Sequence, residues 1–291
     1  MLVNSARSSY AEEFLERGYC IIRGAISEAL VAQVNSQIDA FRQRNDDLLN
    51  RHSLLVEGML QRVVNLHFSV TSLQKVFCQA MAAGAEVVDS YGRATLYTSL
   101  FFELGSQQPL HRDTPYFYSG GDGGYMGVWV ALDNVDENNG ALMVVEGSHK
   151  LPEPDLIALR EQFHPSGNVP ASSPELFDAY NLLLADAANM KGLPIKSCCV
   201  QRGDMIIWNP ATLHGGLSHI DKSRTRRSFV MHITPKNMPM QHMDYFFDRS
   251  KIIKPIEKNY LPIGSDRLIS AGDQIDFRHV KSFSCKDLGV F

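Results

Sequence analysis

The sequence predicts a mainly β protein with flanking helices, in which short strands form a sandwich or a barrel. From residue 94 onward apolar residues follow a period of two, as in strands that expose alternate side chains to opposite faces. Turn signals such as Gly120-Gly-Asp-Gly-Gly124, Asn138-Asn-Gly140 and Arg202-Gly-Asp204 separate the runs. The predicted strands span residues 94–104, 126–132, 141–145, 197–201, 204–208 and 226–234.

Helical patterns flank this strand-rich region. In the clearest of them Leu30, Val34 and Ile38 fall on one face, which indicates an amphipathic helix that packs against a core. We expect helices at 9–17, 27–41 and 72–81, a strand at 19–23, and a mixture of helix and loop at 44–70.

Residues 151–195 interrupt the strand-rich region. They are rich in Leu, Ala, Pro and Asp, with helical spacing near 155–163 and 174–190. We expect an insertion within a single domain that covers residues 1–291. Such an insertion near the mouth of a barrel serves either as a lid with substrate contacts or as a packing decoration, and the sequence leaves both open.

The composition excludes several classes of partner. The 291 residues carry a net charge of −4 without a long basic block, so we expect no nucleic-acid partner. No apolar run reaches the roughly 18 residues that span a bilayer, and the first residues lack a signal-peptide core. We therefore expect a cytoplasmic protein without a membrane partner. Five cysteines without paired spacing predict no disulfide framework, and no heptad or flat apolar edge indicates an oligomeric state.

The first chemical motif is His111-Arg112-Asp113, which follows the predicted strand at 94–104. In an extended chain, residues i and i+2 point to the same side, so the imidazole of His111 and the carboxylate of Asp113 share a face. One histidine and one carboxylate are two thirds of the 2-His-1-carboxylate triad that binds non-haem Fe(II) and leaves coordination positions open.

Among ten histidines, His214 is best placed to complete this triad. It follows the apolar run Met205–Trp208 and precedes Gly215-Gly216, where the backbone can approach a metal closely. We expect His219, one loop further on, to be solvated. His232 reads as a core histidine or a neighbour of the ligands, and His149 as a structural residue at a turn.

A site of this type needs an electron source, which 2-oxoglutarate supplies when its keto-acid end chelates iron. Its distal carboxylate then needs a cation, and the planar guanidinium of arginine binds a carboxylate with two parallel hydrogen bonds. Arg226 and Arg227 begin the last predicted strand. Alternation allows only one of them to point inward.

These motifs, in this order, resemble the phytanoyl-CoA dioxygenase family of Fe(II)/2-oxoglutarate oxygenases. The resemblance covers residues 10 to 235 and includes Gly18–Gly24 and the helix after it. The segments that carry it are His111–Asp113, Val128–Leu142, Gly147–Lys150, Gly203-Asp204, His214–Gly216 and Arg226–Ser228.

The resemblance implies a double-stranded β-helix (jelly-roll, cupin-like) core and a set of site residues. Its metal ligands fall on His111, Asp113 and His214, which would bind Fe(II) together with 2-oxoglutarate and O2, with ascorbate as a supporting reductant in vitro. The 2-oxoglutarate arginine falls on Arg226, with Arg227 as the fallback. A tryptophan that lines the 2-oxoglutarate site falls on Trp129, although a plain core aromatic would fit the same pattern.

Two positions depart from the family pattern. Many members carry a hydroxyl two residues after the distal histidine, where this chain has Gly216, so a co-substrate hydrogen bond must come from elsewhere. Thr98, Gln108 and Tyr97 are the candidates. Many members also carry a lysine in the strand before the HxD motif, where this chain has Glu103.

The expected activity is oxidation of an unactivated C–H bond in a small organic substrate, with release of succinate and CO2. Hydroxylation is favoured, with desaturation or cyclisation as alternatives. Asp113 disfavours halogenation, because related halogenases have a small residue there. A non-catalytic jelly-roll binding protein with a vestigial metal site and a zinc hydrolase are the rival interpretations.

The substrate pocket is expected to be walled by Tyr116–Tyr118, parts of 151–195, and Met238–Phe247. These segments are nearly free of basic residues, which favours a neutral or weakly polar molecule, such as a natural-product intermediate of secondary metabolism.

Overall fold

The computed structural model describes residues 9–120, 124–254 and 257–289. The expectation of no signal peptide rests on residues that include 1–8, and the turn expected at Gly120–Gly124 includes 121–123; residues 1–8 and 121–123 lie outside the described part. The helices are α1 (Tyr10–Arg17), α2 (Glu28–Arg44), α3 (Asp46–Arg51), α4 (Ser72–Ala83), α5 (Ala85–Val88), α6 (Leu156–Phe163), α7 (Pro174–Met190) and α8 (Met243–Phe246), with 3-10 turns η1 (Leu66–Phe68) and η2 (Ser148–Lys150).

The strands are short, and most of them are antiparallel to their neighbours. They are β1 (Tyr19–Ile22), β2 (Leu55–Val56), β3 (Met59–Leu60), β4 (Val63–Val64), β5 (Ala94–Phe102), β6 (Met126–Ala131), β7 (Leu142–Val145), β8 (Ile195–Cys198), β9 (Met205–Trp208), β10 (His214–Gly216), β11 (Ser228–Pro235), β12 (Tyr260–Ile263), β13 (Arg267–Ser270), β14 (Gln274–Phe277) and β15 (Lys281–Ser284).

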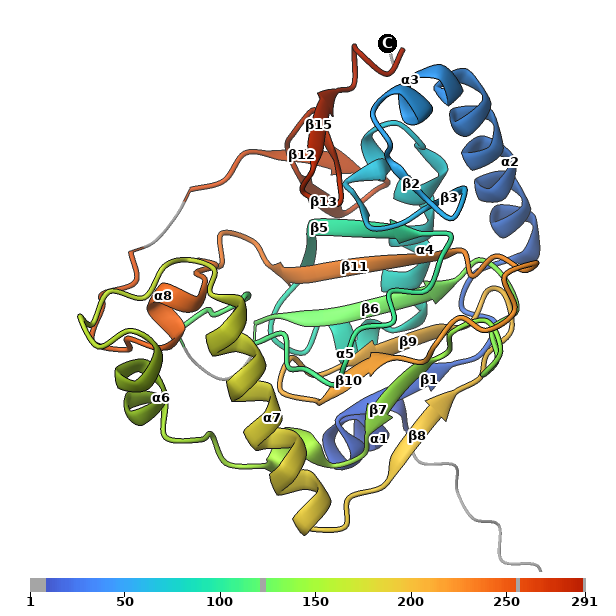
Figure 1. The fold of residues 1–291 in the computed structure, drawn as a ribbon. Coiled ribbons are helices and arrows are strands. Elements are labelled where there is room, and N and C mark those ends of the chain that lie inside the picture. The colour runs from blue at the N-terminus through green and yellow to red at the C-terminus, as the bar shows by residue number, and fades with distance from the viewer. Residues whose placement is uncertain (1–8, 121–123, 255–256, 290–291) are drawn as a thin grey trace, which may run out of the picture.

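Two sheets form the core of the molecule. The major sheet has the strand order β1-β9-β6-β11-β5-β4-β14-β15, and β13 joins it beside β5. The minor sheet has the order β10-β7-β8. In Figure 1 the minor sheet lies beneath the major one, with α7 in front of it. In the part β9-β6-β11-β5 of the major sheet, neighbouring strands are distant in sequence, as in a jelly roll.

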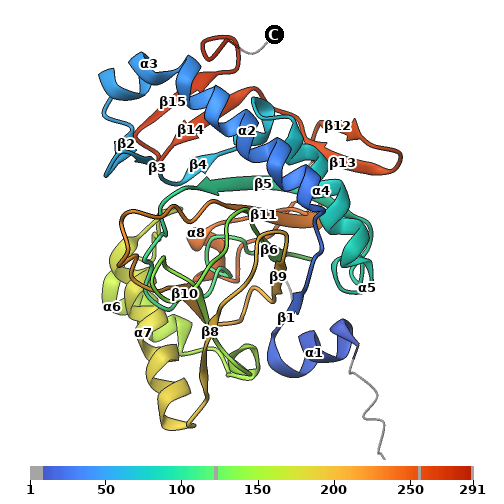
Figure 2. The ribbon, with the colours of Figure 1, turned by 90° about the vertical axis from the view of Figure 1, so that its right-hand side faces the viewer.

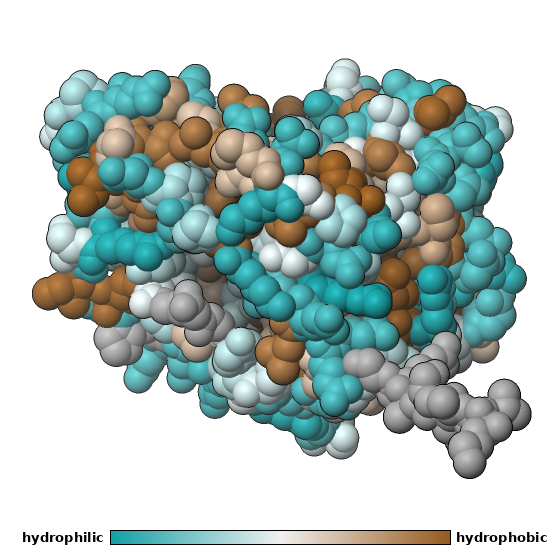
Figure 3. Space-filling view, turned by 90° about the horizontal axis from the view of Figure 1, so that it is seen from below, coloured by the Kyte–Doolittle hydropathy of each residue, from teal (hydrophilic) through white to brown (hydrophobic). Residues whose placement is uncertain are grey.

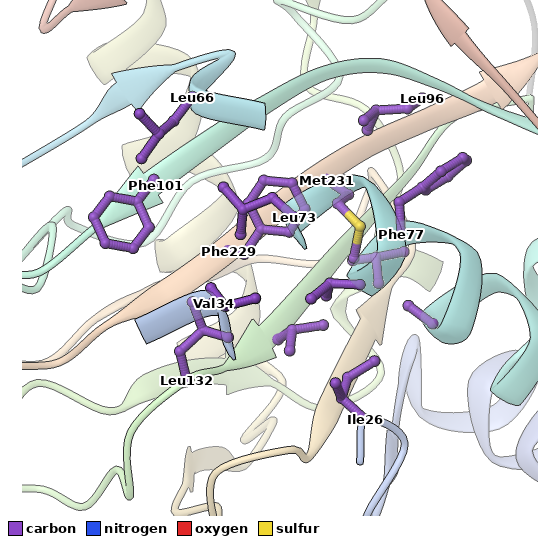
Figure 4. Close-up of a cluster of buried hydrophobic side chains, with 14 of the residues drawn as sticks. Ile26, Val34, Leu66, Leu73, Phe77, Leu96, Phe101, Leu132, Phe229 and Met231 are labelled. Carbon is purple, nitrogen blue, oxygen red and sulfur yellow. The ribbon is translucent and has the colours of Figure 1, made fainter. Parts of the chain in front are cut away.

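The outer face of the major sheet packs against α2 and α4 (Figure 2). Phe101 of β5 with Phe229 and Met231 of β11 lies in one buried cluster with Val34 of α2 and Phe77 of α4. Figure 4 shows these side chains meeting between the sheet and the helices. Burial of this apolar surface, at about 25 cal/mol per Å², is the main source of stability for this half of the molecule.

A β-bulge in β5 sets which residues face the inside. The pairing of β11 with β5 shifts between His232, opposite Thr98, and Ile233, opposite Leu96, so Tyr97 is the extra residue. Leu96 before the bulge and Phe101 after it both pack in the outer core. Thr98 therefore faces inward, as do Leu100 and Phe102.

Helices α6, α7 and α8 cover the other side. Leu159 of α6, Tyr180 of α7 and Phe246 of α8 lie in a buried cluster that also takes in Val145 of β7. On the face shown in Figure 3, hydrophobic residues form separate areas among hydrophilic ones. No described helix is both long enough and apolar enough to cross a bilayer.

The strands and helices expected from the sequence are present, with ends that differ by a few residues. The expectation of helix and loop at 44–70 is incomplete, because the strands β2, β3 and β4 also form there. β10 was not expected, since His214-Gly215-Gly216 contains no residue that favours strands. Its strand form comes from pairing with β7.

Candidate metal centre and cavity

Two chain segments bring the three candidate ligands together. His111 and His214 form an antiparallel bridge, in which the N–H of His111 donates to the carbonyl of His214 (2.9 Å) and the N–H of His214 donates to that of His111 (3.0 Å). Gly215 permits this approach: a Cβ there would lie 2.7 Å from the carbonyl oxygen of Gln108. The glycine pair thus admits the other ligand-bearing segment rather than the metal itself.

The histidine rings are oriented with Nε2 toward Asp113. His111 Nδ1 lies 2.9 Å from the carbonyl oxygen of Pro109, and His214 Nδ1 lies 3.0 Å from that of Thr212. A carbonyl can only accept, so each Nδ1 carries a proton and Nε2 is the ring nitrogen left to bind a metal. Each Nε2 lies 3.7 Å from an oxygen of Asp113.

The carboxylate of Asp113 is fixed by two donors. Trp208 Nε1 (3.0 Å) and the hydroxyl of Tyr125 (3.1 Å) both donate to Oδ2, whereas Oδ1 accepts no hydrogen bond from the described residues. Burial acts to raise the pKa of Asp113, but the adjacent His214 and His111, together with the Trp208 hydrogen bond, hold it below its ordinary value. Asp113 is therefore ionised at neutral pH.

These groups fit a divalent metal ion. One nitrogen or oxygen atom from each of His111, Asp113 and His214 lies within 4.8 Å of the other two, and all three residues are buried. Burial lowers the pKa of His111 to about 4, so its imidazole is neutral at pH 7, the form that binds metals. Two imidazoles and one carboxylate on one side suit Fe(II) and leave the opposite side open.

A cavity of about 720 Å³ opens beside the three residues, within the usual range for small-molecule sites. The cavity is lined by residues of both sheets, by residues of the segment 171–178 and by residues at the ends of several strands. Its lining includes Arg62, Val64, Thr98, Leu100, Phe102, Ser106, Gln108, Tyr116, Phe117, Trp129, Leu142, Ser172, Phe177, Asp178, Trp208, Arg226, Val230, His232, His242 and His279.

Arg226 lines this cavity as a buried cation without an acidic partner. Its side chain donates from Nε to the Gly140 carbonyl (3.1 Å) and from Nη1 to Ser228 Oγ (2.7 Å), and no described carboxylate lies within ion-pair distance. Its guanidinium carbon lies 5.6 Å from the centre of the Trp129 ring. Burial lowers the pKa of Arg226 to about 10. A buried charge of this kind is costly unless an anion accompanies it, which fits a carboxylate of 2-oxoglutarate.

Arg227 points the other way. It forms ion pairs with Glu103 (2.9 Å) and Asp39 (2.5 Å) on the helix side of the sheet. Glu103 is fully buried and also pairs with Arg42 (2.9 Å). The acid that replaces the family lysine therefore belongs to a structural network outside the cavity.

The residues named as sources of a co-substrate hydrogen bond separate into two groups. Thr98 and Gln108 line the cavity, and Thr98 Oγ1 donates to Asn65 Oδ1 (2.9 Å). Tyr97 is absent from the lining, because it occupies the bulge. Ser106 was missed: it lines the cavity, and its Oγ lies 3.1 Å from the position of a Cβ on Gly216. Its hydroxyl is thus near the place where many family members carry one.

The contacts of the remaining motif residues show whether the expectations for these residues hold. His219 was expected to be solvated, which is wrong: it is buried, and its Nε2 bonds to the carbonyls of Asp221 and Arg224. His232 is a buried neighbour of the triad, as expected. Arg112 points away from the triad, since its Nη2 donates to the carbonyls of Ser148 (2.7 Å) and Leu151 (3.1 Å).

The expected pocket wall is partly wrong. Tyr116, Phe117 and the 171–178 segment do line the cavity, as does His242. Tyr118 is absent from the lining, and two basic residues, Arg62 and His279, are present. Neither residue belongs to the segments that were expected to form the pocket wall. The pairing of β4 with β14, which are distant in sequence, brings both residues to the cavity.

Several solved structures have folds similar to that of this chain. The epimerase SnoN in complex with Fe3+, alpha ketoglutarate and nogalamycin RO has a TM-score of 0.58 at 16% identity, covering 90% of this chain and 96% of that chain. The carbocyclase SnoK from nogalamycin biosynthesis has a TM-score of 0.57 at 17% identity, covering 88% and 95%. HygX from Streptomyces hygroscopicus, with nickel and 2-oxoglutarate bound, has a TM-score of 0.50 at 18% identity, covering 76% and 84%. These likenesses confirm the double-stranded β-helix fold.

Sequence comparisons identify the family. The peroxisomal phytanoyl-CoA dioxygenase of Bos taurus is 40% identical over 47 residues, which is 16% of this chain and only 14% of that relative. The phytanoyl-CoA dioxygenase (PhyH) family model matches residues 14–228, most of the chain and all the motifs discussed above. The chain therefore belongs to the phytanoyl-CoA dioxygenase family of Fe(II)/2-oxoglutarate-dependent oxygenases.

Proposed function

We propose that this protein oxidises an unactivated C–H bond of a small organic molecule, with conversion of 2-oxoglutarate and O2 to succinate and CO2. One observation carries the proposal. A buried His-Asp-His triad lines the same cavity as Arg226, a buried arginine with no acidic partner among the described residues. The first matches Fe(II), and the second matches the distal carboxylate of 2-oxoglutarate.

Each residue then has a defined task. His111 and His214 offer Nε2 to the iron, and Asp113 offers Oδ1, while Trp208 and Tyr125 hold the other oxygen. Bound iron with 2-oxoglutarate supplies the oxidising chemistry, and the protein supplies orientation and exclusion of water.

The co-substrate is held at its other end. Arg226 binds the distal carboxylate through its guanidinium, beside Trp129. Ser106, with Gln108 and Thr98 nearby in the lining, provides the hydrogen bond that Gly216 does not.

Hydroxylation is the proposed outcome, and desaturation or cyclisation would yield a product without a new oxygen atom. Asp113 fills the position that halogenation would need to be open. The similar folds include an epimerase and a carbocyclase of nogalamycin biosynthesis, which supports a natural-product intermediate as substrate.

Residues 151–195 are proposed to close over the substrate. Ser172, Phe177 and Asp178 line the cavity from this insertion. Phe177 lies 6.1 Å from the His111 ring, measured between ring centres, so a substrate beside the iron would contact α7. Replacing Phe177 with Ala would then raise the fraction of 2-oxoglutarate consumed without substrate oxidation.

The direct test is succinate release by purified protein supplied with Fe(II), ascorbate and 2-oxoglutarate under air. We expect slow release even without the primary substrate, and none from Asp113→Ala. An Asp113→Ala protein as active as the wild type would contradict the ligand assignment. Wild-type protein that binds neither Fe(II) nor 2-oxoglutarate would favour a vestigial binding protein. Hydrolytic activity without O2 would favour a zinc hydrolase.

A further inference from the structure

We propose that Arg62 binds a carboxylate of the primary substrate, which is therefore an organic acid. This inference rests on the proposed function, in which Arg226 binds 2-oxoglutarate. It deepens that function by assigning a role to Arg62, whose guanidinium is the second one in the cavity lining.

Arg62 directly precedes β4, in which Val63 packs in the outer core and Val64 lines the cavity. Its backbone adopts a left-handed conformation (φ 50°), so strand alternation does not apply to it, and its side chain lines the cavity together with Val64. Its carbonyl accepts from the N–H of Arg278 (3.1 Å), which joins it to the turn between β14 and β15. The same turn places His279 in the cavity lining.

The side chain of Arg62 has no partner among the described residues. Its Nε is buried without a hydrogen bond, and no described carboxylate lies within ion-pair distance. Other arginines near the sheets behave differently: Arg42 pairs with Glu103, and Arg267 with Asp89. An unpaired guanidinium at a cavity wall is a ready site for an anion.

The surroundings indicate where this anion lies and what charge it carries. Arg62 lines the same cavity as His111 and His232, so an anion bound to it lies in the cavity that holds the triad. His232 Nδ1 is a second buried polar atom without a partner. Asp178, which also lines the cavity, and Asp276, 3.2 Å from His279, disfavour a highly charged anion. One guanidinium with acids nearby suits a single carboxylate better than a phosphate.

A matched pair of probes tests this. 3-Phenylpropanoate and its amide differ only in the charged group, and Phe117 and Phe177 offer aromatic surface for the ring. Binding is measured by calorimetry under anaerobic conditions, with protein loaded with Fe(II) and saturated with N-oxalylglycine, which occupies the 2-oxoglutarate site without being oxidised. We expect the acid to bind about 10-fold or more tightly than the amide, as for a hydrogen bond to a charged group.

Variants connect the preference to one residue. Arg62→Gln should remove the preference for the acid, and Arg62→Lys should restore part of it. Arg278→Gln, an equal change of charge at a neighbouring residue outside the lining, should keep it. Equal affinity for acid and amide, binding of neither probe, or an unchanged preference in Arg62→Gln would overturn the proposal.

The affinity for N-oxalylglycine separates this inference from the proposed function. We expect it to be the same in wild type and in Arg62→Gln, which also shows that the variant is folded. If wild-type protein fails to bind N-oxalylglycine, the proposed function fails. If it binds N-oxalylglycine but shows no preference for the acid, only the role of Arg62 fails.

Discussion

The two faces of the major sheet are formed by the same strands but have different functions. Phe229 and Met231 of β11 face α2 and α4 and are completely buried among apolar side chains. Val230 and His232, their neighbours in the same strand, face the cavity together with Arg226. On the helix side, charged groups such as Arg227 and Glu103 pair with each other. On the cavity side, Arg226 and Arg62 lack acidic partners among the described residues.

This difference separates stability from binding. The helix face buries apolar surface and satisfies its ions internally, so substitutions there should change the free energy of unfolding. The cavity face keeps cations and ligand atoms unpaired, which costs stability and provides binding sites. Paired variants on the two faces test this division, from the largest expected effect to the smallest.

Phe229→Ala should give the largest loss of stability. Removing a fully buried phenyl ring leaves a void against α4 and costs about 3–5 kcal/mol in the free energy of unfolding. Urea denaturation measures this. Val230→Ala, one residue on, opens toward an existing cavity and should cost much less. Equal losses in the two variants would show that the cavity face is packed as tightly as the helix face.

Arg226→Met should weaken 2-oxoglutarate binding by about 30-fold or more, the effect of truncating one partner of a buried charged pair. The unfolding free energy of the protein without ligands should change by no more than about 1 kcal/mol, because relief of an unpaired buried charge offsets two lost hydrogen bonds. Anaerobic calorimetry and urea denaturation give the two values.

Arg227→Met is the matched control. It leaves the buried Glu103 with one cation fewer and should lower stability while 2-oxoglutarate affinity stays the same. If instead Arg227→Met weakened 2-oxoglutarate binding and Arg226→Met lowered stability, Arg227 would be the residue that binds the distal carboxylate of 2-oxoglutarate.

Acid should weaken the fold through His67, which lies on the helix side and bonds through Nδ1 to Ser99 Oγ (2.7 Å). Burial lowers the pKa of His67 to about 3. Between pH 6.5 and 3 the unfolded chain takes up a proton that the folded protein does not, so stability falls as pH falls. This histidine alone should remove about 2 kcal/mol between pH 7 and pH 5. Denaturation at both pH values should show a smaller loss in His67→Gln, and an equal loss would rule out this histidine as a cause.

Ser106→Ala should have the smallest effect, a loss of about 2- to 10-fold in 2-oxoglutarate affinity, as expected for one hydrogen bond. Adding Gly216→Ser to this variant returns a hydroxyl to the family position and should recover much of the loss. No effect of Ser106→Ala would assign the hydrogen bond to Gln108 or Thr98.

Local patterns in the sequence were sufficient for the long strands and helices. The alternation in 94–104 and 226–234 and the spacing in 27–41 predict elements that the structure contains at nearly the same residues. The grouping of His111, Asp113, His214 and Arg226 around one cavity was also predictable, because residue type and order are properties of the chain itself.

What the sequence did not reveal depends on contacts between distant segments. Arg62 lies in a stretch with no clear period and reaches the cavity only because β4 pairs with β5 and β14. His219 is likewise buried against a distant segment: its Nδ1 accepts from the N–H of Gly105 (3.3 Å), and its own N–H donates to Gln107 Oε1 (3.3 Å). The signal for Arg62 was slight: an arginine two residues before Val64 in a short apolar run.

The most direct measurement is an anaerobic titration of Fe(II)-loaded protein with 2-oxoglutarate, followed by the visible charge-transfer absorption of a 2-oxo acid chelated to Fe(II). We expect the absorption to saturate at one equivalent in wild-type protein, to be absent in Asp113→Ala, and to require much more 2-oxoglutarate in Arg226→Met. Wild-type protein that gives no absorption, or an Asp113→Ala protein that gives the same absorption, would contradict the assignment of this cavity face as the iron and 2-oxoglutarate site.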